Sequence, residues 1–94
     1  MNELGRILIV EDDPRDLELT LAALAEHNLA NEVVITRDGK QALDYLYCRG
    51  EFSTRSNENP AVLLLDLKLP KVDGLEVLEQ IKLDERLKII PVWC

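Results

Sequence analysis

Ile7-Leu8-Ile9-Val10-Glu11-Asp12-Asp13-Pro14 places four apolar residues directly before three acidic ones, and this stretch decides the fold. A second stretch, Val62-Leu63-Leu64-Leu65-Asp66, repeats the arrangement with one acidic residue at its end. An unbroken apolar run is typical of a strand that is covered on both faces, as in a parallel sheet flanked by helices. We therefore expect both runs to be buried strands with carboxylates at their carboxyl ends.

Two further apolar runs, Val33-Val34-Ile35 and Ile89-Ile90-Pro91-Val92, predict a second and a fourth strand. Three stretches with helical spacing separate the four runs, and each has an Asp at its start that can cap the first turn. These caps are Asp13, followed by Pro14, then Asp38, with Gln41 three residues later, and Asp73, with Glu76 three residues later. The residues expected to face inward are Leu17, Leu21 and Leu24, then Ala42, Tyr45 and Leu46, then Leu75, Leu78 and Ile81. This alternation predicts an α/β fold with a doubly wound parallel sheet.

The chain has 94 residues, enough for one domain, which we assign to residues 1–94. Gly50 is expected to end the second helix, and residues 50–59 to form a polar surface loop of unusual length. A net charge of −7 without a basic cluster argues against direct binding of nucleic acid. No apolar run approaches the length needed to cross a bilayer, and the two isolated cysteines form neither a disulfide framework nor a metal site. We expect a cytoplasmic protein without a membrane partner.

The acidic residues form the candidate site. In a doubly wound sheet the first and third strands are neighbours, so Glu11, Asp12, Asp13 and Asp66 would gather at one end of the sheet. Clustered carboxylates repel one another, and Mg²⁺ relieves that repulsion because it prefers oxygen ligands. A carboxylate beside such an ion can attack a phosphoryl group. Simpler interpretations stay open: Asp13 as a helix cap only, Glu11 and Asp12 as a solvated turn, and Asp66 as a structural residue.

Both acidic stretches resemble the receiver domain of response regulators in two-component signalling. The first resembles the opening of that domain, and the stretch Leu63-Leu64-Leu65-Asp66-Leu67-Lys68-Leu69-Pro70-Lys71-Val72-Asp73-Gly74 resembles its phosphorylation site. The resemblance implies a flavodoxin-like fold with Asp66 as the phosphoryl acceptor. It also implies a Mg²⁺ ion bound by Asp12, Asp66, the backbone carbonyl of Lys68 and Glu11, the last through water.

A finer resemblance concerns the phosphoryl donor. The segment Ala42-Leu43-Asp44-Tyr45-Leu46, followed by Arg49-Gly50 and the long loop, is similar to receivers that partner bacterial phytochromes. The donor implied by the resemblance is the phosphohistidine of a sensor histidine kinase, here of the phytochrome type.

The sequence departs from the family in its fourth strand, inside which the chain ends. A family member continues with a further helix, a fifth strand and a last helix, and it carries a Ser or Thr after strand four and a Lys after strand five. Neither has a counterpart here, because Lys82 and Lys88 lie at other places. We therefore expect a truncated receiver with impaired switching. One hypothesis is that a single-base deletion produced the Trp93-Cys94 ending, which sequencing the gene tests. The alternatives are a deliberate truncation and a natural short paralogue.

A fourth strand at the edge of the sheet would expose Ile89, Ile90, Val92 and Trp93, and such an edge invites pairing with another chain. We expect a homo-oligomer formed through this edge.

Three functions follow from these features. The first is a receiver that accepts a phosphoryl group on Asp66 and is not a conventional enzyme. The second is a module that serves only for assembly. The third, a Mg²⁺-dependent phosphohydrolase, is disfavoured because those enzymes usually have a second Asp two residues after the nucleophile, where this chain has Lys68.

Overall fold

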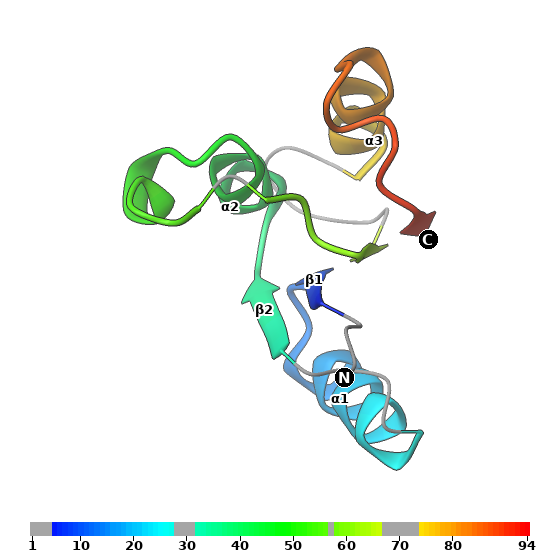
Figure 1. Ribbon diagram of the computed structural model, residues 1–94. Coiled ribbons are helices and arrows are strands. Elements are labelled where there is room, and N and C mark those ends of the chain that lie inside the picture. The colour runs from blue at the N-terminus through cyan, green and yellow to red at the C-terminus, as the bar shows by residue number, and fades with distance from the viewer. Residues whose placement is uncertain (1–4, 28–31, 57, 67–73) are drawn as a thin grey trace.

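The fold is a parallel sheet of four strands with helices on both faces (Figure 1). It is seen in a computed structural model that describes residues 5–27, 32–56, 58–66 and 74–94. The strand order is β2-β1-β3-β4, and all neighbouring pairs are parallel. The strands are β1 (Arg6–Val10), β2 (Glu32–Thr36), β3 (Val62–Leu65) and β4 (Val92–Trp93). The helices are α1 (Pro14–Glu26), α2 (Gly39–Leu46) and α3 (Gly74–Leu83), with a short 3₁₀ helix η1 (Gly50–Phe52). The predicted doubly wound α/β fold is confirmed.

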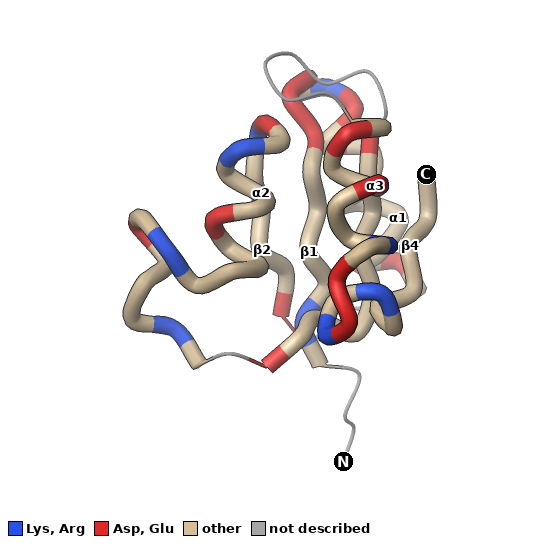
Figure 2. The backbone as a smooth tube through the Cα atoms, turned by 90° about the horizontal axis from the view of Figure 1, so that it is seen from above, with Lys and Arg blue, Asp and Glu red and all other residues tan. Residues whose placement is uncertain are grey.

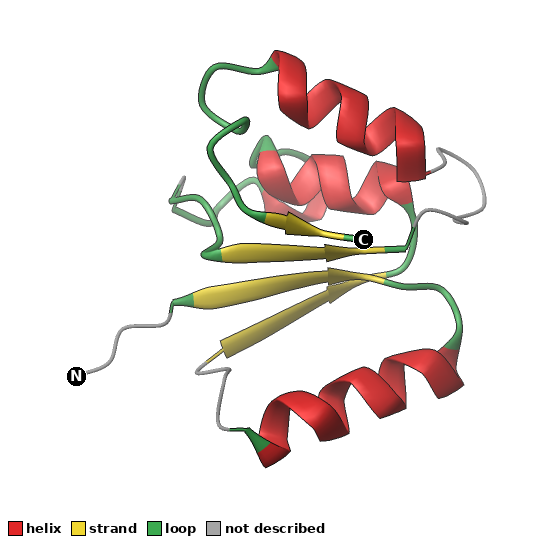
Figure 3. Cartoon of the chain, turned by 90° about the vertical axis from the view of Figure 1, so that its right-hand side faces the viewer, coloured by secondary structure: helices red, strands yellow, loops and turns green. Residues whose placement is uncertain are grey.

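The sheet separates two apolar layers. Helix α1 covers one face, whereas α2 and α3 cover the other (Figure 3). Because side chains alternate along a strand, Ile7 and Ile9 of β1 pack toward Leu17 of α1, and Leu8 and Val10 pack into the larger cluster with α2 and α3. That cluster also contains Leu63, Leu65, Ala42, Tyr45, Leu46, Val77 and Ile81. The unbroken apolar runs are therefore explained by burial on both faces.

The predicted helix starts are confirmed for the first two helices. The Asp13 carboxylate accepts hydrogen bonds from the backbone N–H groups of Arg15 (2.8 Å) and Asp16 (3.4 Å). The Asp38 carboxylate accepts one from the N–H of Gln41 at 2.8 Å. Each bond satisfies a donor that the first helical turn leaves unpaired. Asp73, the predicted start of the third helix, lies outside the described residues.

The inward face of α3 differs from the prediction. Leu75 was expected to face inward, but 62% of it is exposed, whereas Val77 is completely buried. Val77 and Ile81 are four residues apart and share one side of the helix, and Leu75 lies about 200° around the axis from Val77. Val77 and Ile81 therefore belong to the core cluster, and Leu78 is partly buried against it.

The fourth strand is shorter than predicted. Ile89 and Ile90 were expected to belong to it, but β4 contains only Val92 and Trp93. The preceding residues form a turn, in which the N–H of Ile90 donates to the carbonyl of Leu87 at 3.0 Å. This turn places Ile90 in the core and leaves Ile89 72% exposed. The backbone groups used in the turn are not available to the sheet.

The long loop after α2 contains a short 3₁₀ helix that the sequence analysis did not predict. Helix α2 ends at Leu46, so Gly50 does not end it; Gly50 instead starts η1 with a positive φ of 61°. Phe52 packs edge-on against the Tyr45 ring, with 5.1 Å between the ring centres. The Arg55 guanidinium lies 3.9 Å from the centre of that ring, and its Nε donates to the Tyr45 carbonyl at 2.7 Å. The loop is thereby attached to the carboxyl end of α2.

None of the described helices has the length and apolar character required to span a membrane.

Two substitutions in α3 test the assignment of its buried face. Ile81 is completely buried, and replacing it with Ala should lower the free energy of unfolding by about 2–5 kcal/mol, because the lost apolar contacts leave a cavity. Leu83, in the same helix, is 82% exposed, so Leu83→Ala should change it by less than about 0.5 kcal/mol. Urea unfolding monitored by circular dichroism measures both values. Equal losses for the two variants would contradict the assignment.

Candidate metal centre

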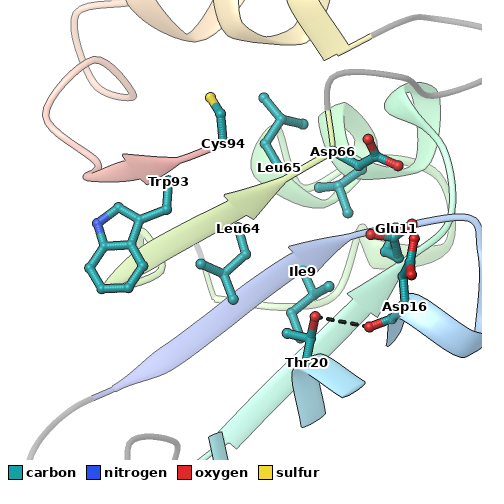
Figure 4. A pocket seen from close by; sticks show the side chains of 10 residues that line it. Ile9, Glu11, Asp16, Thr20, Leu64, Leu65, Asp66, Trp93 and Cys94 are labelled. Atoms are coloured by element: carbon teal, nitrogen blue, oxygen red, sulfur yellow. Dashed lines mark hydrogen bonds between the residues drawn. The ribbon is translucent and has the colours of Figure 1, made fainter. Parts of the chain in front are cut away.

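The pairing of β1 with β3 brings the acidic residues together. In the parallel register Val10 lies opposite Leu65, so the next residues, Glu11 and Asp66, leave the sheet side by side. The N–H of Asp66 donates to the Val10 carbonyl at 3.1 Å, and the N–H of Glu11 donates to the Thr36 carbonyl of β2 at 3.0 Å. Figure 4 shows the Glu11 and Asp66 side chains at the same end of the sheet. The predicted neighbourhood of these two residues is confirmed.

Three carboxylates converge there. Glu11, Asp12 and Asp66 each offer one oxygen, and these oxygens lie within 4.8 Å of one another. Glu11 and Asp66 are half-buried, whereas Asp12 is exposed. Oxygens bound to Mg²⁺ lie at about 2.1 Å from the ion, so opposite ligands of an octahedron are about 4.2 Å apart. The upper limit on the oxygen separations is thus close to the diameter of a magnesium shell, so the three residues are near enough to share one ion.

The electrostatics of the cluster favour a cation. Burial raises the pKa of the Glu11 carboxyl, and the negative charges of Asp66 and Asp16 raise it further. The N–H of Asp13 opposes this effect by donating to Glu11 Oε2 at 3.2 Å. A divalent cation would remove the repulsion among these groups and stabilise the ionised form of Glu11. Figure 2 shows acidic residues of several segments together at this end of the sheet.

Not every predicted residue joins the cluster. Asp13 was expected to gather with the other three carboxylates, but it caps α1, as the simpler interpretation of this residue allowed. Its oxygen is already occupied by two backbone N–H groups of the helix. Lys68, whose backbone carbonyl is a predicted ligand, and Pro70 lie outside the described residues. The carbonyl of Lys68 therefore remains a prediction.

The structure adds one acidic residue, Asp16, that the sequence analysis missed. A cavity of about 500 Å³ extends from the cluster along the α1 side of the sheet. Its lining consists of Ile9, Val10, Glu11, Asp16, Thr20, Leu64, Leu65, Asp66, Trp93 and Cys94. The position of Asp16 in the first turn of α1 was the available signal, since this helix begins directly after the acidic stretch.

Comparisons with known proteins agree with this geometry. Residues 7–93 match the family described as "Response regulator receiver domain". The response regulator Rcp1 of Synechocystis sp. (strain ATCC 27184 / PCC 6803 / Kazusa) is 43% identical over 86 residues, which are 92% of this chain and 57% of Rcp1. The chain therefore spans little more than half the length of this relative.

Solved structures show the same similarity. The bacteriophytochrome response regulator RtBRR superposes with a TM-score of 0.92 at 61% identity, covering 96% of this chain and 54% of RtBRR. The phosphorylated cyanobacterial phytochrome response regulator RcpA superposes with a TM-score of 0.84 at 48% identity, covering 94% of this chain and 61% of RcpA. A further structure is the Mn²⁺-bound form of Rcp1, with a TM-score of 0.85 at 42% identity, covering 94% of this chain and 62% of that one.

The family match covers nearly the whole chain, and the strand order and acidic cluster are those that the resemblance implied. Receiver domains bind Mg²⁺ or Mn²⁺ in their active sites, which agrees with three carboxylates at the carboxyl ends of β1 and β3. The chain belongs to the receiver domains of two-component response regulators.

Proposed function

We propose that the carboxylate of Asp66 accepts a phosphoryl group while Mg²⁺ is bound by Glu11, Asp12, Asp66 and the backbone carbonyl of Lys68. The observation that carries this proposal is the convergence of three carboxylate oxygens within 4.8 Å of one another. Mg²⁺ commonly bridges one or two carboxylates to a phosphate and keeps several waters, so a partly open cluster suits it. Glu11 contributes its charge through a water molecule of the ion.

The reaction is a displacement at phosphorus. One oxygen of Asp66 forms a bond to the phosphorus atom, and the bond between phosphorus and the leaving atom of the donor breaks. The leaving group departs with that electron pair. Bound Mg²⁺ neutralises negative charge on the phosphoryl oxygens. Glu11 and Asp12 fix the position of the ion beside Asp66, and the β1–β3 pairing keeps the three residues in place.

The proposed donor is the phosphohistidine of a sensor histidine kinase. The similarity to Rcp1, RtBRR and RcpA supports a kinase of the phytochrome type. In that reaction the phosphorus–nitrogen bond of the donor breaks and the imidazole leaves. The proposed location of this signalling module is the cytoplasm. Its proposed contribution to catalysis is limited to accepting the phosphoryl group and losing it again.

Substitution of Asp66 tests the acceptor directly. Incubation of the 94-residue chain with acetyl phosphate and Mg²⁺ should add the mass of one phosphoryl group, with acetate as the leaving group. Asp66→Asn should abolish the addition, because the amide is a much weaker nucleophile. Chelation of the metal should also abolish it. Intact-mass spectrometry in acid measures all three samples.

The matched control is Glu85→Gln. Glu85 follows the carboxyl end of α3, is exposed, and pairs with Lys88 at 3.1 Å. The substitution removes one negative charge, as Asp66→Asn does, but outside the cluster. This variant should gain the phosphoryl mass as the wild type does. Addition that survives Asp66→Asn, or no addition to the wild-type chain, would show that Asp66 is not the acceptor.

A second proposal is assembly through the edge formed by β4, and it is favoured by exposed apolar residues in this strand and in the turn before it. Trp93 is 65% exposed and Ile89 is 72% exposed, and β4 is the edge strand of the described sheet.

Light scattering at micromolar concentration should give the mass of a dimer or a larger assembly. Ile89→Lys should shift the mass toward the monomer, whereas Leu19→Lys, at a 70% exposed site on α1, should not. A wild-type monomer would refute this proposal.

A further inference from the structure

Asp16 lies beside the proposed metal centre, although the three-residue cluster does not include it. It is the third residue of α1, and this helix begins at Pro14, directly after the acidic stretch. The cavity that contains Glu11 and Asp66 is also lined by Asp16. Figure 4 shows the Asp16 side chain next to Glu11, with Asp66 on the neighbouring strand end. The fold therefore brings a further carboxylate to the cavity from a different element.

The backbone of Asp16 is held on both sides. Its N–H donates to Asp13 Oδ1 at 3.4 Å, and its carbonyl accepts a hydrogen bond from Thr20 Oγ1 at 3.0 Å (Figure 4). The first bond belongs to the cap of α1, and the second is a bond from a Thr hydroxyl to the carbonyl four residues earlier. The position of the Asp16 backbone is thus fixed by the first turn of the helix.

The charges in the cavity explain what Asp16 can do there. Three of the lining residues are acidic, and among the described residues no Lys or Arg lines the cavity. Asp16 is not one of the three residues whose oxygens lie within 4.8 Å of one another, so we do not assign it as a direct ligand. Mg²⁺ retains several waters, and a carboxylate in the layer outside the direct ligands can accept a hydrogen bond from one of them.

We propose that Asp16 is a positioning residue that accepts a hydrogen bond from a water molecule of the bound Mg²⁺ ion and thereby increases the affinity for Mg²⁺. This proposal rests on the proposed function of the Glu11, Asp12 and Asp66 cluster. It adds a residue that contacts neither the phosphoryl group nor the metal directly. The negative charge of Asp16 also adds to the attraction for a divalent cation.

Calorimetric titration of the wild-type chain with Mg²⁺ tests the role of Asp16. Asp16→Asn should weaken binding about tenfold, which is the lower end of the usual effect of losing an outer-layer partner of a metal site. Asp16→Glu keeps the charge and should recover most of the affinity. The matched control is Glu18→Gln, an exposed acidic residue of α1 that does not line the cavity, and it should bind Mg²⁺ as the wild type does.

Unfolding by urea without Mg²⁺ provides the structural control. Asp16→Asn and Asp16→Glu should unfold at similar urea concentrations, so that a difference in Mg²⁺ affinity between them reflects the charge rather than the stability of α1. Equal affinities for Asp16→Asn and Glu18→Gln would overturn the role of Asp16 while leaving the Asp66 proposal intact. Failure of Asp16→Glu to recover affinity would also overturn it. A wild-type chain that binds no Mg²⁺ would overturn both proposals.

Discussion

The parallel pairing of β1 with β3 is the constraint on which the rest of the site depends. The register sets Val10 opposite Leu65, and it therefore determines that Glu11 and Asp66 emerge next to each other. Because successive side chains of a strand point to opposite faces, a slip of one residue would move Leu63 and Leu65 out of the core. Burial of these two leucines on the face covered by α2 and α3 thus maintains the distance between the acidic residues. Core packing and site geometry are consequences of the same register.

The site has an energetic cost that the fold alone does not offset. Burial and the neighbouring charges of Asp66 and Asp16 raise the pKa of Glu11, which means that the ionised cluster is less favourable than isolated carboxylates would be. Unfolding would separate these charges, so the cluster lowers the stability of the metal-free chain. A bound divalent cation reverses this effect, and binding to the folded state alone would stabilise the domain. Metal binding and stability are therefore coupled in this account.

Much of this arrangement could be predicted from the sequence because it depends on local patterns. The unbroken runs ending at Val10 and Leu65 identified two buried strands, and Asp13 and Asp38 identified two helix starts. The joint position of Glu11, Asp12 and Asp66 followed from the order of strands in a doubly wound sheet. What could not be predicted depends on contacts between distant segments. The place of Asp16 in the first turn of α1 was one available signal, but its position at the cavity also depends on how α1 packs against the sheet.

The errors in the third helix and the fourth strand have the same origin. Leu75 fits the apolar spacing of a buried face as well as Leu78 does, and only the docked position of α3 leaves Leu75 exposed. Ile89 and Ile90 read as strand because they are β-branched and adjacent, yet a turn closed by the Leu87 carbonyl separates them from β4. Local propensity was overridden by packing in both cases.

The most direct test of the account is the location of a metal ion in crystals grown with Mn²⁺, whose anomalous scattering distinguishes it from water. Mn²⁺ is suitable because it takes the same kinds of oxygen ligands as Mg²⁺. The account predicts one anomalous peak that lies within direct coordination distance, about 2.2 Å, of oxygens of Asp12 and Asp66, with Glu11 at the same ion through water. A peak at Asp12 alone, or no peak between these residues, would contradict the claim that one cation joins the ends of β1 and β3.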